Sequence, residues 1–406
     1  MKVRAEIKKS VEAYRGQPGQ IVADKLVKCP VEVRAAMGNR ENLKKMVQRK
    51  KRGNAPNDPK TTSDIPSSLP EEYTHMGEQQ FLVYDNNGDS DRVLVFSSDI
   101  GLSLLSEANV WFVDGTHSTA PKQFSQLFVV RVPLGNTHVS AVYGLLPSKT
   151  QAVYEEFLTA VLDVCLSRSL RPDPNTVVAD FEIGIHNAVR SVLRQDIHIQ
   201  GCFYHLTQST WRRLQADGLQ AAYKEDDEIR TFVGMLDGLA FLPVDRVSEG
   251  MTVLREEAPE ELNSVVDYFD HTYVSGSFRC VATDGVMRFR RTPPRFPPHV
   301  WNVHEVTLSG NHRTNNICES WNSGFKHLVG SANPSLWTVI TSLKKDVAHT
   351  ETENLQHQHG IQPRKRRRMK NINHQNRLKT LCDQLVGGEK TVKEFLVAIG
   401  QCIRLK

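Results

Sequence analysis

Two short stretches decide the fold: Val110-Trp111-Phe112-Val113-Asp114-Gly115-Thr116 and Thr176-Val177-Val178-Ala179-Asp180-Phe181-Glu182. Each opens with four residues that are mostly β-branched or aromatic, which is typical of a short strand buried on both faces. An aspartate follows each run directly. Because the carboxyl ends of strands in an open α/β sheet border a crevice where sites form, Asp114 and Asp180 are candidate site residues.

The segments on either side predict further strands and helices. Strands are expected at 81–84, 93–96, 110–113, 126–132, 139–146, 176–179 and 198–204, and helices at 154–165 and 183–193. From residue 110 onward the order is three strands, helix, strand, helix, strand, which resembles the layout of the ribonuclease H-like fold. In that layout the first three strands form a meander, and helical crossovers add the later ones. We therefore predict an α/β fold with a ribonuclease H-like mixed sheet flanked by helices.

A helical block is expected to interrupt this core before its last acidic residue. Helical spacing predominates from 206 to about 290, the Pro- and Arg-rich stretch 289–298 is expected to be irregular, and a final helix at 316–328 carries Glu319. The expected organisation is a helical basic N-terminal region and linker (1–69), the first part of the core (70–205), a mainly helical insertion (206–308), the last part of the core with the catalytic helix (309–350), and a basic tail with short helices (351–406).

Composition excludes several classes of protein. No run of eighteen or more apolar residues occurs in the 406, so no membrane partner is expected. The first ten residues are charged and lack the apolar stretch of a signal peptide. Seven cysteines at irregular spacing argue against a disulfide framework and favour a reducing compartment.

Basic residues gather in two runs although the net charge is only +5. One run is 49–52, and the other spans 364–370 with six Lys or Arg residues. Such runs suit phosphate contact or import into the nucleus, which is the expected location. A solvated charge run in a flexible segment explains them equally well.

The acidic residues have structural explanations when taken singly. Asp114 precedes a glycine and suits a turn, Asp180 can begin the helix at 183, and Glu319 can complete a capping box with Asn316. Taken together on the predicted sheet, they favour a metal site. Phosphodiester chemistry uses two hard cations, and carboxylates from different elements are the ligands that hold Mg²⁺ or Mn²⁺.

Several motifs in one order resemble the core of Mutator-like (MULE) transposases. They are Asp114-Gly115-Thr116, Gln126-Leu127, Tyr143-Gly144-Leu145-Leu146, Tyr154, Asp180-Phe181-Glu182, Gly201-Cys202-Phe203-Tyr204-His205, Leu239-Ala240-Phe241-Leu242-Pro243, Trp301-Asn302, Arg313-Thr314-Asn315-Asn316 and Glu319-Ser320-Trp321-Asn322. The resemblance covers about residues 75–330. It implies a DDE catalytic core in which Asp114, Asp180 and Glu319 bind two Mg²⁺ or Mn²⁺ ions.

The resemblance also implies a reaction and its partners. Water would cut a phosphodiester at the end of a transposable element, and the freed 3′-hydroxyl would then attack target DNA. Both steps are in-line displacements that a single two-metal site can serve. The implied partners are the terminal repeats of the element and the target DNA. A homo-oligomer is expected during the reaction because two DNA ends must be brought together.

Cys202 and His205 form a Cys-x-x-His pair that also matches the family. The pair could supply half of a Zn²⁺ site, with the other ligands drawn from His299, His304, His312 and Cys318. The alternatives are a buried cysteine in a strand beside a hydrogen-bonded histidine, or a histidine that contacts DNA near the active site.

Arginines near aromatic residues and prolines are candidate DNA contacts. They are Arg212 and Arg213 beside Trp211 in the helical block, and Arg288, Arg290 and Arg291 in the expected basic loop. Ordinary helical core is the competing interpretation of the first group.

Relatives often carry an N-terminal zinc finger. Cys29 is the only cysteine before Cys165, so the N-terminal segment cannot build a Cys₂His₂ finger.

Two other functions remain open from the sequence. A host-adopted DNA-binding regulator would keep the fold without cleavage, although all three acids are present. An unrelated ribonuclease H-like nuclease is the third possibility. Exonucleases of that fold usually carry Asp-x-Glu on the first strand, whereas here this pair occurs only at Asp180 and Glu182.

Overall fold

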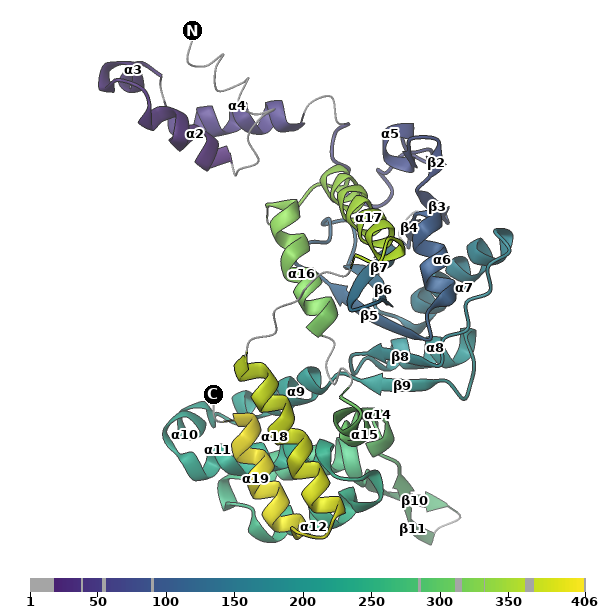
Figure 1. Ribbon diagram of the computed structural model, residues 1–406, viewed down its shortest axis with the longest axis vertical. Coiled ribbons are helices and arrows are strands. Elements are labelled where there is room, and N and C mark those ends of the chain that lie inside the picture. The colour runs from purple at the N-terminus through teal and green to yellow at the C-terminus, as the bar shows by residue number, and fades with distance from the viewer. Residues whose placement is uncertain are drawn as a thin grey trace.

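The computed structural model describes residues 18–37, 39–52, 56–88, 91–283, 286–310, 316–331, 333–361 and 369–404. The start of the expected helical N-terminal region (1–17) and the basic residues 364–368 lie outside these ranges. Within them, no helix is both long and apolar enough to cross a membrane. Figure 1 shows a small helical unit at the N-terminus, a sheet covered by helices, and a second helical unit that contains the C-terminus.

The protein is a mixed α/β protein built on a seven-stranded mixed sheet with the order β3-β4-β7-β6-β5-β8-β9. The strands are β3 (Leu82–Asp85), β4 (Leu94–Ser97), β5 (Val110–Thr116), β6 (Gln126–Leu134), β7 (Thr137–Leu146), β8 (Thr176–Ala179) and β9 (His198–Gly201). The pairs β5–β6 and β6–β7 are antiparallel, whereas β5–β8 and β8–β9 are parallel. The strands expected from the sequence are therefore present, and the last one ends at Gly201 rather than at 204.

The parallel pair β5–β8 brings the two aspartates to the same edge of the sheet. Its register pairs Val110 with Thr176 and Phe112 with Val178. Continued by two residues, that register sets Asp180 level with Asp114. The apolar runs that form these strands thus also fix the relative position of the two carboxylates.

Helices cover both faces of the sheet because consecutive strand residues point to opposite faces and both sets are largely apolar. Phe128 and Val130 share a core with α6 (Asp99–Glu107), α7 (Gln151–Ser167) and α8 (Ile183–Val192). Leu127 and Val129 point to the opposite face, where α16 (Asn316–Val329) and α17 (Leu336–Gln358) pack. Figure 1 shows these two layers of helices with the sheet between them. The chain returns to the sheet at α16 after the whole helical block.

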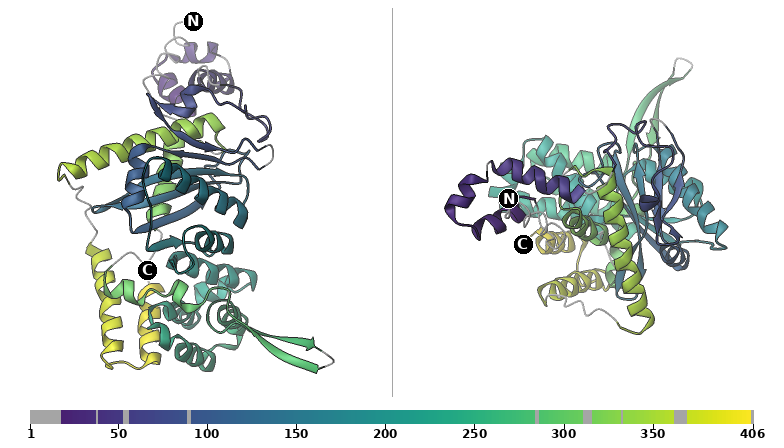
Figure 2. Two further views of the ribbon diagram at one scale, coloured as in Figure 1. Left: turned by 90° about the vertical axis from the view of Figure 1, so that its right-hand side faces the viewer. Right: turned by 90° about the horizontal axis from the view of Figure 1, so that it is seen from above.

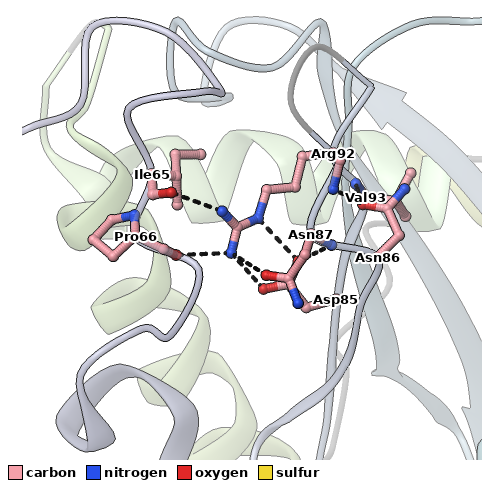
Figure 3. Close-up of polar contacts among 8 residues, drawn as sticks. Ile65, Pro66, Asp85, Asn86, Asn87, Arg92 and Val93 are labelled. Atoms are coloured by element: carbon pink, nitrogen blue, oxygen red, sulfur yellow. Dashed lines mark hydrogen bonds and ion pairs between the residues drawn. The ribbon is translucent and has the colours of Figure 1, made fainter.

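Residues 57–69 pack on the sheet unit instead of forming the free linker that was expected. Arg92 is 3% exposed, and it donates to the carbonyl oxygens of Ile65 (2.8 Å) and Pro66 (2.9 Å). The same guanidinium binds both oxygens of Asp85, at 2.9 and 2.6 Å (Figure 3). The side chains of Ile65 and Leu69 are buried, so this extended segment contributes to the apolar core. Two short elements follow it, α5 (Glu71–Thr74) and the hairpin β1 (His75–Met76) and β2 (Gln79–Gln80).

The helical unit combines the expected insertion with the C-terminal helices. Its elements are α9 (Phe203–Ala216), α10 (Gln220–Glu225), α11 (Asp227–Gly238), α12 (Val247–Glu257), α13 (Asn263–Phe269), α14 (Pro298–Trp301), α15 (His304–Leu308), α18 (Met369–Val386) and α19 (Val392–Arg404). One apolar cluster runs through all of them except α10 and α15, whose apolar residues pack against its edge. Helices α11 and α19 approach closely at Gly234 and Gly400, where an added methyl group on Gly234 would lie 2.6 Å from the carbonyl oxygen of Gly400.

The basic stretch after residue 276 is a β-hairpin, whereas helical spacing was expected to about 290 and irregular structure over 289–298. Strand β10 (Ser277–Thr283) pairs antiparallel with β11 (Val286–Thr292). Figure 2 shows the hairpin projecting away from the helices. The prolines that suggested irregular structure begin at Pro293, where the ladder ends, because proline cannot donate a ladder hydrogen bond.

The N-terminal helices form a separate small cluster. They are α2 (Pro18–Val27), α3 (Val31–Ala36) and α4 (Arg40–Arg52). Ile21, Val22, Leu43 and Val47 bury against one another. The basic run 49–52 lies at the end of α4.

Candidate active site

Asp114 occupies the fifth position of β5 and is 6% exposed. Its Oδ1 accepts a hydrogen bond from the backbone N–H of Gly115 at 3.0 Å, and its Oδ2 accepts one from Nδ2 of Asn322 at 2.8 Å. Burial raises the pKa of the Asp114 carboxyl to about 6, although both hydrogen bonds favour the charged form.

Asp180 follows β8 directly and carries a buried oxygen without a partner. Within the described ranges its Oδ1 has no hydrogen-bond partner. The backbone is held more firmly, because Nε2 of His186 lies 2.8 Å from the carbonyl oxygen of Asp180. Burial, followed by the charges of Glu182 and Asp114, raises the pKa of Asp180 to about 7.

Glu319 reaches the same place from the first turn of α16. Nη1 of Arg131 on β6 donates to the carbonyl oxygen of Ile317 at 2.9 Å, and Cys318 packs against Phe112 and Val178. Burial, with the charge of Asp114 second, raises the pKa of Glu319 to about 6. The charge of Asp114 thus acts on both other acids, so the fold brings the three predicted acids into one electrostatic group.

A chain of polar side chains supports this group from the opposite face of the sheet. Gln126 donates to the hydroxyl of Tyr154 at 2.8 Å, and Tyr154 donates to Oε2 of Glu182 at 2.8 Å. Lys149 forms an ion pair with Oε1 of Glu182. Positive charge from Lys149 lowers the pKa of Asp114 and Asp180, which opposes the effect of burial.

Cys202, His205 and Glu319 form a second group that shares Glu319 with the first. One ligand atom from each lies within 4.8 Å of the others, and the structure shows no other such group of three among the residues it describes. Cys202 precedes α9, and its backbone N–H donates to the carbonyl oxygen of Ala179 at 2.9 Å. Cys202 thus follows directly on the end of β9, whereas His205 lies in the first turn of α9.

Comparison with known families identifies the segment that holds most of these residues. Residues 110–209 match the family model described as the MULE transposase domain. The chain carries a MULE transposase domain. A search of the curated proteins found no match. The matched segment includes Asp114, Asp180, Cys202 and His205, and Glu319 lies beyond it.

The other predicted zinc ligands do not join the group around the Cys-x-x-His pair of the MULE transposase domain. Nδ1 of His304 is 2.7 Å from the carbonyl oxygen of Phe241 in the helical core. His299 lies on α14, and Cys318 belongs to the apolar contact that docks α16. None of these three belongs to the metal-ligand group. His312 lies outside the described residues.

The predicted DNA-contacting arginines fall into two places. Arg212 and Arg213 lie on α9, just beyond the matched segment of the MULE transposase domain. Arg213 donates to Oδ2 of Asp217 at 2.9 Å. Burial lowers the pKa of His205, and the positive charge of Arg212 lowers it further. Arg290 and Arg291 are exposed on β11. Arg288 lies on the same strand, and its side chain is outside the described part.

Sequence reasoning gave no role to Asn322, Glu182 or Lys149. The spacing of Glu319 and Asn322 could have revealed the first, because residues three apart share one face of a helix. Lys149 lies in the loop before α7, and no local sequence pattern predicts its contact with Glu182, 33 positions away.

Proposed function

We propose that this protein is a DDE transposase that cuts the ends of a Mutator-like element and joins them to target DNA. The observation that carries the proposal is the convergence of Asp114, Asp180 and Glu319 at one edge of the sheet in a chain with a MULE transposase domain. The order β7-β6-β5-β8-β9, a meander extended by two parallel strands, supports a ribonuclease H-like core. The return of the chain to this core at α16 supports a helical insertion before the last acid.

The residues at this edge fit a pair of hard divalent cations. Asp180 Oδ1 and Glu319 Oε1 are buried oxygens without hydrogen-bond partners among the residues described. Three carboxylates in one place repel one another, and each has a raised pKa. Donors that are all oxygen suit Mg²⁺ or Mn²⁺. When bound, two such ions would activate the attacking oxygen and stabilise the leaving oxygen of a phosphodiester.

The surrounding side chains orient these acids and favour their ionised form against the effect of burial. Asn322 fixes Asp114 Oδ2, and the N–H of Gly115 fixes Oδ1. His186 holds the backbone of Asp180, and the positive charge of Lys149 favours the carboxylates. Water and then a 3′-hydroxyl would attack in line, so the protein needs to orient the reacting groups and forms no covalent intermediate.

The projecting hairpin supplies a surface that suits DNA. Arg279 and Arg290 are paired across the ladder on one face, and Phe278, Cys280 and Phe289 lie on the other. Phe278 is 71% exposed and Phe289 is 79% exposed. A two-stranded ribbon fits the major groove, and arginine suits phosphates and guanine edges. We assign Arg290 and Arg291 to DNA contact here, together with Arg288 on the same strand and Arg212 and Arg213 on α9.

The remaining expectations belong to the same proposal. The DNA partners would be the terminal repeats and the target, and two DNA ends held at once require at least a dimer. The basic runs at 49–52 and 364–370 suit transport into the nucleus, where the substrate lies.

Cleavage of plasmid DNA tests this function without knowledge of the repeats. The full chain is incubated with supercoiled plasmid and Mg²⁺ or Mn²⁺, and nicked product is measured over time. Asp114→Asn, Asp180→Asn and Glu319→Gln should each reduce metal-dependent nicking by more than about a hundredfold, because each removes a ligand charge. Asp173→Asn is the matched control, since this exposed aspartate forms an ion pair with Arg194 at the surface.

Two outcomes would oppose cleavage as the function. Nicking that persists in the three site variants at the rate of Asp173→Asn would place the activity elsewhere, such as in a contaminant. Tight DNA binding without nicking in the unaltered protein would instead support the host-adopted regulator.

A further inference from the structure

Glu319 belongs to two groups of side chains that need different ions. The charge of Asp114 acts on it, and ligand atoms of Cys202 and His205 lie within 4.8 Å of its carboxylate. No group of Asp114, Asp180 and Glu319 with ligand atoms within 4.8 Å of one another occurs in the described part of the chain. In this conformation the three acids therefore do not form such a compact group, whereas Cys202, His205 and Glu319 do.

We propose that Cys202, His205 and Glu319 bind one Zn²⁺ ion. With zinc bound, the Glu319 carboxylate cannot join the two aspartates in binding the catalytic cations, so zinc competes with those cations. The zinc site itself stands on the geometry of these three residues. Its regulatory effect rests on the proposed function, because that function makes Glu319 a ligand of Mg²⁺ or Mn²⁺.

The ligand set is one that zinc prefers. A thiolate, an imidazole and a carboxylate are the three protein donors that bind Zn²⁺, at about 2.0–2.3 Å. In a tetrahedral site such ligand atoms lie about 3.5 Å apart, so a spread within 4.8 Å needs only a small change of side-chain rotamers. Three protein ligands leave the fourth position open. Hard cations such as Mg²⁺ avoid a cysteine sulfur, which separates this site from the all-oxygen one.

Two rigid helix starts hold the ligands. The N–H of Cys202 is bonded to the carbonyl oxygen of Ala179, immediately before Asp180. His205 follows in the first turn of α9, three residues later, so both point to the same side of that turn. Glu319 lies in the first turn of α16, which Arg131 ties to β6. The site is thus built on secondary structure and not on mobile loops.

Two buried atoms in this group lack the partners that buried polar atoms normally have. They are Nδ1 of His205 and Oε1 of Glu319, neither of which has a hydrogen bond within the described residues. Either ring nitrogen of His205 can bind a metal, and the carboxylate offers a free oxygen. An ion at this place would satisfy the unpartnered oxygen and complement its negative charge.

Cobalt absorption tests the site directly on the purified full chain. Co²⁺ replaces Zn²⁺ with the same ligands, and a bond from Co²⁺ to a thiolate adds a charge-transfer band in the near ultraviolet. One equivalent of Co²⁺ should produce this band, and Zn²⁺ should abolish it. The band should be lost in Cys202→Ser, and Glu319→Gln should weaken Co²⁺ binding by at least about tenfold. Cys280→Ser is the matched control, because Cys280 lies exposed on the hairpin.

Competition for Mn²⁺ tests the regulatory half without any enzyme assay. Free Mn²⁺ is measured by electron paramagnetic resonance with and without one equivalent of Zn²⁺. Zinc should weaken Mn²⁺ binding by the unaltered chain at least about tenfold, and it should have no such effect on Cys202→Ser. Both measurements are of binding, so a failure to cleave DNA would contradict the proposed function and leave this result intact.

Three results would overturn the proposal. Absence of the cobalt–thiolate band in the unaltered chain excludes the site. A band of unchanged affinity in Glu319→Gln removes Glu319 from it. Mn²⁺ binding that is indifferent to zinc shows that the two groups do not compete.

Discussion

Asn322 on α16 donates a hydrogen bond from Nδ2 to Oδ2 of Asp114 on β5 at 2.8 Å, across 208 positions of sequence. Asn322 lies one turn after Glu319 on the same helix. The bond therefore sets the distance between the first and last acids of the site as well as the orientation of Asp114. It also favours the charged form of Asp114, because a donor to a carboxylate lowers its pKa.

Replacing Asn322 with alanine should lower metal-dependent nicking about 10- to 100-fold, the usual effect of losing a side chain that orients a metal ligand. The affinity for Mn²⁺, measured by titration, should fall with it. Ser320→Ala on the same helix is the control, since Ser320 is exposed. Equal nicking rates in the two variants would show that Asn322 only fastens α16 to the sheet.

Tyr154 links Gln126 to Glu182, and its hydroxyl both accepts and donates a hydrogen bond. Tyr154→Phe should cost about 1–3 kcal/mol of unfolding free energy, because the buried amide nitrogen of Gln126 loses its closest partner. Urea denaturation measures this loss. The same change should slow nicking, because Glu182 is freed beside Asp180.

Tyr84→Phe provides the comparison, because Tyr84 also donates to a glutamate, Glu156, at 2.9 Å. This second pair ties β3 to α7 away from the three acids. The variant should lose stability and keep its nicking rate. If both tyrosine variants slowed nicking equally, the effect would be one of general stability and not of the network.

Local sequence was enough to predict the two aspartates but not their surroundings. The apolar runs before Asp114 and Asp180 predict strands on their own. The register of the parallel pair of strands then places the two aspartates side by side. The hairpin was not predicted, because the prolines after Thr292 indicate irregular structure and not a strand. Alternation of Phe278, Arg279 and Cys280 has the period of two that marks a strand with two different faces.

Contacts between distant elements left no such local signal. The approach of Glu319 to Cys202 depends on where two helix starts meet, and neither helix encodes the position of the other. The docking of α19 on α11 similarly depends on a fit between Gly234 and Gly400, which lie 166 positions apart (400 − 234 = 166). A single sequence shows each of these residues but does not show which of them are in contact.

The three acids should make the metal-free protein less stable as pH rises. Asp180 has a pKa of about 7 in the folded protein and an ordinary value of 3.8, so between these values the folded state binds the proton more tightly than the unfolded state does. Stability contributed by that proton is complete below about pH 4 and is lost as the pH rises through 7. Asp114 and Glu319, with pKa values of about 6, act in the same direction.

Thermal unfolding in EDTA at pH 5 and pH 8 measures this effect. The melting temperature should fall more between the two pH values in the unaltered protein than in Asp180→Asn, whose amide does not titrate. Adding Mg²⁺ at pH 8 should recover part of the loss, because an ion that binds only the folded state stabilises it. An identical pH dependence in Asp180→Asn would contradict the raised pKa.

The C-terminal helix should be essential to the helical unit because it neutralises a buried acid. Asp237 on α11 is 0% exposed; it accepts from Thr210 Oγ1 at 2.8 Å and forms an ion pair with Arg404 of α19. Arg404→Met should destabilise the protein by about 3–5 kcal/mol, since it leaves an unpaired buried carboxylate whose pKa burial already raises.

Combining Arg404→Met with Asp237→Leu should recover most of that loss, because replacing both charges by apolar side chains of similar volume is often neutral. Urea denaturation of the two single variants and the double variant measures the coupling. Additive losses in this cycle would mean that α19 is held by its apolar face alone.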